Sequence, residues 1–112
     1  MVKYRGRGVS YMVDFTANIV LESNTAKKWP VAVVGKLDTG ARRTSIDEDL
    51  ASFLRLEECG ETTVTNAMGK QNRKLVKLNL IWEHQLYSVE ASVTDRGNLS
   101  TPVIIGQDII GD

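Results

Sequence analysis

An apolar run ends at a carboxylate in residues 33–41, which read VVGKLDTGA. A strand over the apolar residues would fix the position of Asp38. Gly40 would let backbone N–H groups approach the carboxylate, where a Cβ would obstruct them, and Thr39 adds a hydroxyl. Small Ala41 leaves room for a substrate backbone. Asp-Thr-Gly also occurs in ordinary turns, so the segment indicates a reactive aspartate only together with its surroundings.

The elements that must position this segment are predicted to be mostly strands. Apolar residues in alternating or continuous runs predict strands over 9–21, 31–37, 62–65, 73–82, 86–94 and 103–105, of which 31–37 and 103–105 read as buried. Polar segments predict turns or loops at 22–28, 57–60, 83–85 and 95–98. Many short strands separated by turns indicate an all-β fold, a small closed β-barrel, in a single domain over residues 1–112.

Two short helices and a hairpin tip complete the predicted elements. Asp47 can cap a helix from Glu48 to about Leu56, because an acidic first turn suits the helix dipole. Residues 107–110 can form a terminal helical turn after Gly106. Residues 66–70, NAMGK, are expected at the tip of a hairpin. The face of the first helix that we expect to be buried carries Leu50, Phe53 and Leu54.

Composition restricts the partners and the location. Fourteen Lys plus Arg balance fourteen Asp plus Glu, so net charge favours neither nucleic acid nor an acidic membrane as a partner. Residues 1–8 are basic and rich in glycine, and we expect a loose arm or an interface strand there. We identify no signal peptide and no segment long enough to span a membrane. The single cysteine, Cys59, is compatible with a reducing compartment, and we expect a cytoplasmic protein.

Metal, nucleotide and thiol chemistry have little support in the residues. A zinc site needs three or four ligands from Cys, His and carboxylates, and Cys59 and His84 alone represent the first two classes. No His-Glu-x-x-His motif and no phosphate-binding glycine loop with a lysine occurs, so we expect no metal and no cofactor. Glu57 and Glu58 next to Cys59 would raise the pKa of its thiol. We expect His84 in a solvated turn.

The order of these segments resembles the retropepsin-like aspartic proteases. Residues 38–41 (DTGA) resemble the catalytic loop of that superfamily, and residues 46–51 (IDEDLA) its short strand and capped helix. Residues 65–69 (TNAMG) lie where the family has its flap, a hairpin that closes over substrate, and residues 103–110 (VIIGQDII) resemble its second signature. The resemblance spans about residues 31–110. It implies an aspartic endopeptidase, a hydrolase, with Asp38, Thr39 and Gly40 in the catalytic loop.

A narrower resemblance is to the bacterial and phage family named "ATP-dependent zinc protease". Residues 36–42, 93–98 and 102–108 carry it. Members of that family often accompany a ligase that adds glutamate tails to a ribosomal protein, so the resemblance implies a peptidase that acts on acidic, glutamate-rich tails. Gln107 stands where an arginine is usual in that family, and residues 43–47 match only approximately.

The resemblance also implies a homodimer. An aspartic peptidase needs two carboxylates that share a proton and a water, and this sequence has one Asp-Thr-Gly. The second aspartate would come from a second chain, with the pair on the twofold axis. Because only Gly111 and Asp112 follow the predicted terminal helix, we expect the N-terminal arm to form the interface, or the dimer to be different or weak. The alternative function is a catalytically weak or inactive retropepsin-like dimer that serves as a binding or assembly module.

Basic residues near the loop suggest contacts with acidic side chains of substrate. Arg42 and Arg43 follow the loop directly, and the flap region adds Lys70, Arg73 and Lys74. An alternative for Arg42 is a structural ion pair with the terminal helix, through Asp108.

The flap tip would cover a bound peptide. Gly69 permits the bend and Met68 offers an adaptable apolar cover, although an ordinary hairpin turn is the alternative. The full set of expected substrate-binding residues is Ala41, Arg42, Arg43, Ala67, Met68, Gly69 and Ile105.

Overall fold

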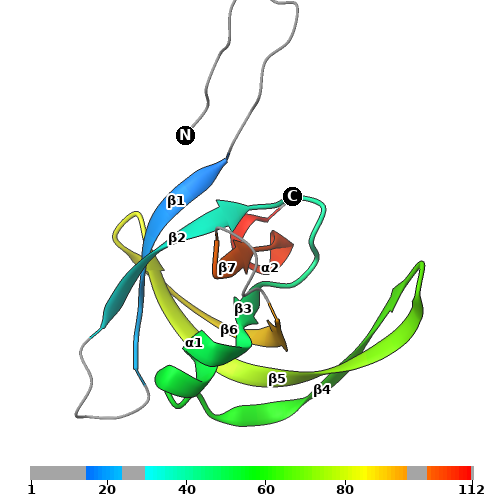
Figure 1. The fold of residues 1–112 in the computed structure, drawn as a ribbon. Helices are drawn as coiled ribbons and strands as arrows, with labels where there is room; N and C mark the ends of the chain where they lie inside the picture. The colour runs from blue at the N-terminus through cyan, green and yellow to red at the C-terminus, as the bar shows by residue number, and fades with distance from the viewer. Residues whose placement is uncertain (1–14, 24–29, 96–100, 112) are drawn as a thin grey trace, which may run out of the picture.

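The computed structural model describes residues 15–23, 30–95 and 101–111, which are mostly strand, as predicted (Figure 1). Both predicted helices are present. No helix among these residues is long and apolar enough to cross a bilayer. The elements in chain order are β1 Thr16–Leu21, β2 Val31–Leu37, β3 Ser45–Asp47, α1 Glu48–Phe53, β4 Glu58–Asn66, β5 Gly69–Trp82, β6 Gln85–Thr94, β7 Val103–Ile105 and α2 Gln107–Ile110.

Some predicted features lie outside the described residues. They are the N-terminal arm, the part of the first strand before residue 15, most of the turn at 22–28, and the turn at 95–98 beyond Asp95.

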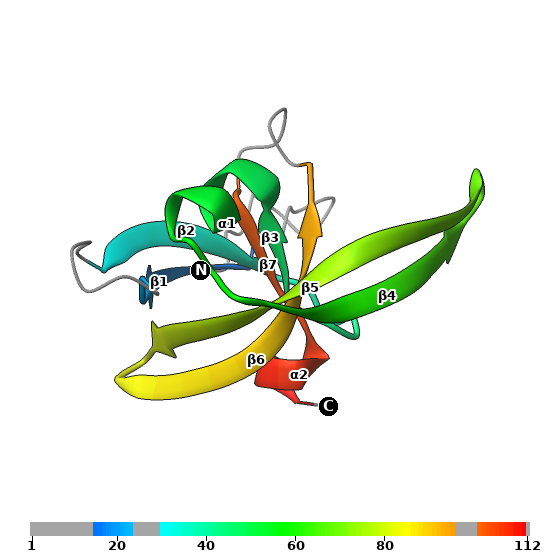
Figure 2. The ribbon, with the colours of Figure 1, turned by 90° about the horizontal axis from the view of Figure 1, so that it is seen from below.

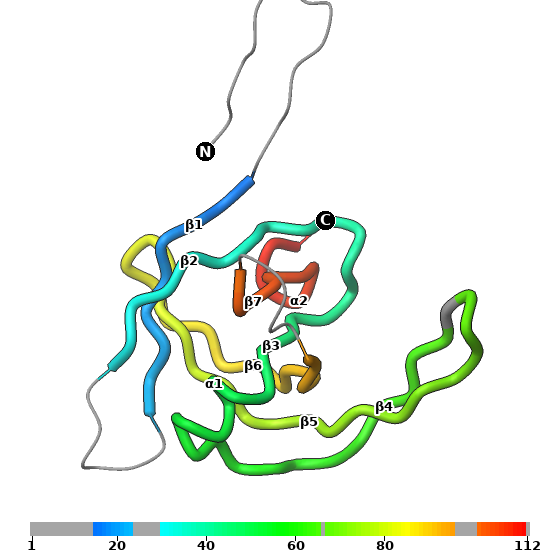
Figure 3. Tube along the Cα trace, in the orientation of Figure 1, coloured from blue at the N-terminus to red at the C-terminus, as the bar shows by residue number. Residues whose placement is uncertain are grey.

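The strands close into a ring. The order of neighbours is β1-β2-β7-β3-β6-β5-β4, and β1 also pairs with β5 through Val20↔Ile81 and Leu21↔Leu80. This extra pairing closes the ring and leaves β4 outside it, as can be followed along the trace in Figure 3. β2 pairs with β7, and β3 with β6, in parallel. Closure satisfies the backbone groups that open edges would expose.

One apolar core joins the strands and α1. Asp47 caps α1 as predicted, because its carboxylate accepts from the N–H groups of Asp49 and Leu50 at 3.1 and 3.2 Å. The helix then buries Leu54 completely. Each such side chain contributes roughly 1.5–3 kcal/mol when it is fully buried. Other fully buried members of the core are Ile19, Leu21, Ile46, Leu78, Leu80, Val103 and Ile105.

Two apolar segments are less buried than the sequence predicts. β2 was expected to be buried, yet its side chains alternate, with Val33 and Leu37 packed on the core and Val34 43% exposed. Successive side chains of a strand point to opposite faces, and no other described element covers the outer face of β2. Phe53 was expected on the buried face of α1 but is 54% exposed, since it lies at the end of the helix.

β4 and β5 form a long hairpin that projects from the ring (Figures 1 and 2). Their pairing runs as far as Asn66↔Gly69. β4 begins at Glu58, so the predicted loop at 57–60 is mostly strand. A bulge between Glu58 and Gly60 accommodates the irregular sequence there, and the φ of 155° at Gly60 favours glycine.

A turn joins β5 to β6 within the predicted segment 83–85, and it has two residues because Gln85 already pairs with Trp82. Glu83 and His84 have φ values of 51° and 66°, as both central residues do in a type I′ hairpin turn. Both side chains are exposed. His84 is therefore a solvated turn residue.

Candidate functional site

Asp38 lies where β2 ends and a tight loop begins. Its N–H donates to the carbonyl oxygen of Ile105 at 3.0 Å, which extends the pairing of β2 with β7. Its carboxylate accepts from the Gly40 N–H at 2.9 Å. A Cβ on Gly40 would lie 3.2 Å from the same carboxylate oxygen. The predicted approach of a glycine N–H to this carboxylate is confirmed.

The first turn of α2 holds the loop in place. The Gln107 N–H donates to the Ala41 carbonyl oxygen at 2.8 Å, and the Gln107 side-chain amide donates to the Thr39 carbonyl oxygen at 2.6 Å. At Gly106, an added Cβ would come within 2.7 Å of the Arg43 backbone. Because backbone atoms cannot move aside cheaply, this position needs glycine. The contacts of Gly106 and Gln107 thus hold in place the loop that presents Asp38.

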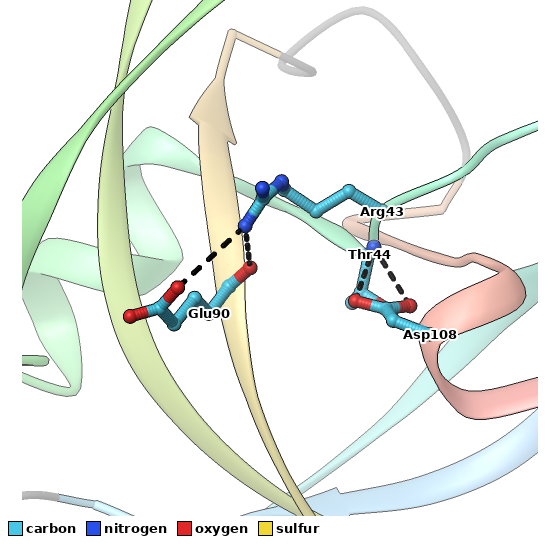
Figure 4. A network of polar contacts seen from close by, with 4 residues as sticks. All are labelled: Arg43, Thr44, Glu90 and Asp108. Carbon is cyan, nitrogen blue, oxygen red and sulfur yellow. Dashed lines mark hydrogen bonds and ion pairs between the residues drawn. The ribbon is translucent and has the colours of Figure 1, made fainter.

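Thr44 and Asp108 form a second link between the loop and α2 (Figure 4). The Thr44 N–H donates to both carboxylate oxygens of Asp108, at 3.0 and 2.9 Å. The Thr44 hydroxyl donates to the same carboxylate at 2.7 Å and accepts from the Gly106 N–H at 3.1 Å. Thr44 is fully buried. We call this arrangement the Thr44–Asp108 clamp.

The clamp replaces the ion pair that the sequence suggested between Arg42 and Asp108. In the described residues the Asp108 carboxylate is bonded by Thr44 rather than by a guanidinium. Sequence reasoning missed Thr44, since nothing in a Thr-Ser-Ile segment marks a hydroxyl that bonds a residue 64 positions away.

Arg43 reaches across to β6. Its Nη1 donates to the Glu90 carbonyl oxygen at 3.1 Å and lies 3.9 Å from Glu90 Oε1 (Figure 4). Both side chains are partly exposed, so this ion pair contributes little to stability. It does hold the guanidinium against β6.

A groove of about 850 Å³ lies between the segment after Asp38 and the β4–β5 hairpin. We call it the hairpin groove. Its described walls contain three arginines, Arg42, Arg43 and Arg73, and no carboxylate. The other lining residues are mostly hydroxyl-bearing or apolar: Ala41, Ser45, Thr62, Thr63, Val64, Thr65, Ser92, Thr94 and Ile104.

The structure brings part of the predicted substrate-binding set to this groove. Ala41, Arg42 and Arg43 line it, whereas Ile105 is buried in the core and Ile104 takes the groove position. One step along β7 changes the face on which a side chain lies. The hairpin tip, with Ala67, Met68 and Gly69, is not part of the groove walls, and Met68 is 95% exposed.

Cys59 has the character of an unreactive thiol. Burial raises its pKa above the ordinary value, and the charge and hydrogen bond of Glu90 raise the pKa further, while Lys77 opposes them. A thiol with a raised pKa is a poor nucleophile at neutral pH. Within the described ranges, no three His, Cys, Asp or Glu side chains gather as a metal site would require.

A family comparison covers most of this architecture. The sequence model of a family described as aspartyl protease matches residues 30–109. That span contains Asp38, the β4–β5 hairpin and the Thr44–Asp108 clamp. No curated protein sequence gives a significant match.

Solved structures with a similar fold include retroviral proteases. The EIAV protease bound to the inhibitor HBY-793 has a TM-score of 0.66 and 14% identity, over 95% of this chain and 91% of that one. The simian foamy virus (mac) protease has a TM-score of 0.61 and 9% identity, over 85% and 90%. A Legionella pneumophila protein of unknown function has a TM-score of 0.54 and 19% identity, over 86% and 83%. At these identities the likeness concerns the fold.

Proposed function

The chain belongs to the aspartyl protease family and has a retropepsin-like fold, and from this premise we propose that it is an aspartic endopeptidase that acts as a homodimer. The observation that carries the proposal is the Asp38 carboxylate, held by the Gly40 N–H at 2.9 Å on a loop fixed to α2. A carboxylate on a loop held by hydrogen bonds, with the next residues, 41–43, lining a groove, provides what general acid–base catalysis requires: a positioned proton donor or acceptor near a place where a substrate can bind.

The proposed mechanism uses one Asp38 from each chain. Two carboxylates that face each other closely share one proton, because like charges at short range cannot both be ionised. The ionised Asp38 takes a proton from water as the water oxygen attacks the scissile carbonyl carbon. Its protonated twin donates a hydrogen bond to the carbonyl oxygen and polarises it. A proton then goes to the leaving nitrogen as the C–N bond breaks. Thr39 and Gly40 shape the loop.

We further propose that the substrate is a peptide with acidic, glutamate-rich segments. The positive charge of the hairpin groove, which has arginines and no carboxylate among its described walls, supports this substrate. The resemblance to the "ATP-dependent zinc protease" family points the same way. On binding, Ala67, Met68 and Gly69 would close over the peptide as the hairpin bends toward the loop. The lone cysteine fits a reducing compartment, and we place this activity in the cytoplasm.

The test is hydrolysis of a mixed peptide library that includes glutamate-rich tails. Wild type is compared with Asp38→Asn and with Asp49→Asn, a control that removes an exposed carboxylate from α1. The pH is varied, products are identified by mass spectrometry, and the mass of the protein is measured at each concentration. We expect Asp38→Asn to lose cleavage and Asp49→Asn to keep it. The rate should rise with the dimer fraction.

Three outcomes would contradict the proposal. A chain that stays monomeric at every concentration cannot assemble the pair of aspartates. A folded dimer that cleaves nothing in the library would favour the binding or assembly module instead. Cleavage that persists in purified Asp38→Asn would remove Asp38 as the catalytic residue.

A further inference from the structure

Arg73 carries an unpaired buried donor. Its Nε is buried and has no hydrogen-bond partner in the described part of the chain. Buried donors in folded proteins nearly always have a partner, and an exception calls for an explanation. A ligand that supplies the missing acceptor is one such explanation, provided that the group faces a site a ligand can enter.

The position of Arg73 meets that condition. It lies on β5 opposite Thr62 of β4, and both residues line the hairpin groove. Arg73 also lines a second cavity of about 620 Å³ beside α1. Arg73 therefore lines two cavities: the hairpin groove, whose described walls have no carboxylate, and the cavity beside α1, which is also lined by Glu48, Glu58 and Asp95.

Three of the other basic residues on or near the hairpin already have acidic partners. Lys74 Nζ is 3.3 Å from Glu58, and Lys77 Nζ is 2.9 Å from Glu57. Arg43, within the groove itself, is held by Glu90. Among the described residues, Arg73 forms no ion pair.

The chain offers an extended peptide a place to bind beside Arg73. β4 ends the order of strands and pairs with β5 alone among the described strands, so its other edge is open. Residues 62–65 of that strand line the groove. An extended peptide can add to such an edge through backbone hydrogen bonds, and its alternate side chains then face the groove. The negatively charged group that such a peptide can offer to Arg73 at neutral pH is the side-chain carboxylate of aspartate or glutamate.

We propose that Arg73 is a specificity-determining residue that binds a carboxylate side chain of the bound peptide. The guanidinium presents its N–H groups as a planar fork that matches the two oxygens of a carboxylate, and the Nε–H takes part in that fork. Arg42 adds positive charge to the same groove. This inference rests on the proposed function for the identity of the occupant.

The experiment separates binding from cleavage by using Asp38→Asn as the background. Two short fluorescein-labelled peptides are compared by anisotropy at low salt, one rich in glutamate and one with glutamine in its place. The proteins are Asp38→Asn alone and with Arg73→Gln, Arg73→Lys or Lys77→Gln. Lys77→Gln is the matched control, because it removes one positive charge from the same strand but outside the groove.

We expect Arg73→Gln to weaken binding of the glutamate peptide by about tenfold, the loss of one charge-assisted contact. Binding of the glutamine peptide should change less than twofold. Arg73→Lys should recover part of the loss, since it restores charge without the fork. Lys77→Gln should leave both affinities nearly unchanged. Thermal melting of each variant checks folding, and Arg73→Gln should not lower the melting temperature because it removes no internal partner.

The results that overturn the inference differ from those that overturn the proposed function. Equal losses for both peptides in Arg73→Gln, or no loss for either, would remove Arg73 as a specificity determinant. Cleavage by wild type without preference for acidic peptides would do the same while leaving the peptidase intact. Selective binding that depends on Arg73, in a dimer that cleaves nothing, would refute the peptidase and keep Arg73 as an acidic-peptide contact.

Discussion

Replacing Thr44 by valine tests whether the Thr44–Asp108 clamp holds the loop that presents Asp38. Valine has nearly the shape of threonine, so the fully buried site stays filled. The change removes only the hydroxyl, which donates to the Asp108 carboxylate at 2.7 Å and accepts from the Gly106 N–H at 3.1 Å. The bonds from the Thr44 backbone N–H to Asp108 remain.

The expected loss follows from these two contacts. A hydrogen bond to a charged group is worth roughly 1.5–3 kcal/mol, and a buried donor left without a partner costs about 1–3 kcal/mol. Gly106 is buried, so its N–H would lose its acceptor with no access to bulk water. Taking the lower ends of both ranges, we expect the free energy of unfolding to fall by about 2.5 kcal/mol. At about 4 °C per kcal/mol, the melting temperature should fall by about 10 °C.

Urea unfolding followed by tryptophan fluorescence, at one fixed protein concentration, measures this loss. Thr63→Val is the matched control, because the Thr63 hydroxyl bonds Asn72 at 3.0 Å on the exposed hairpin. Exposed substitutions of this kind change stability by about 0.5 kcal/mol or less. Thr44→Ser keeps the hydroxyl and should recover most of the loss. If Thr44→Val destabilised the chain no more than Thr63→Val does, the clamp would have no net role and the reasoning would be wrong.

Three further predictions concern other parts of the chain. Asp47→Ala removes the cap of α1 and should lower the free energy of unfolding by about 1 kcal/mol, whereas Asp47→Asn should be nearly neutral; urea titration decides. His84→Gly should raise stability by about 1 kcal/mol, because glycine adopts the positive φ of 66° without strain; an unchanged melting temperature would contradict this. Iodoacetamide should alkylate Cys59 more slowly than a free cysteine peptide at neutral pH, since burial and Glu90 raise the thiol pKa. Glu90→Gln should lower that pKa and speed alkylation, as mass spectrometry at several pH values would record.

Local signals in the sequence were enough to predict most elements. The cap of α1 rests on one aspartate followed by an acidic turn, and the turn at Glu83 and His84 separates two alternating apolar segments. Gly106 and the apolar residues before it mark the end of β7. Each of these features depends on residues close together in the chain, where spacing alone carries the information.

The contacts that complete the site depend on residues far apart in the chain. Thr44 forms a hydrogen bond to Asp108, 64 positions away in the chain, and Arg43 forms one to Glu90, 47 positions away. The groove position of Ile104 depends on the exact pairing of β7 with β2 and β3, and a shift of one residue would exchange it with Ile105. Hydrophobic periodicity does not indicate such long-range partners. The sequence therefore identifies the charged residues near the site but does not predict which residues they contact.

The hydrogen bonds between the Asp38 loop and α2 also determine when the loop can be fixed during synthesis of the chain. The loop that presents Asp38 takes hydrogen bonds from Gln107 and has its other link at Asp108. A nascent chain must therefore extend past these residues before the loop can be fixed, although the loop itself leaves the ribosome much earlier. Contacts over such long separations form late and slowly. A chain interrupted before residue 106 would carry Asp38 without the hydrogen bonds that fix its loop, so an incompletely synthesised chain would have no assembled site at Asp38.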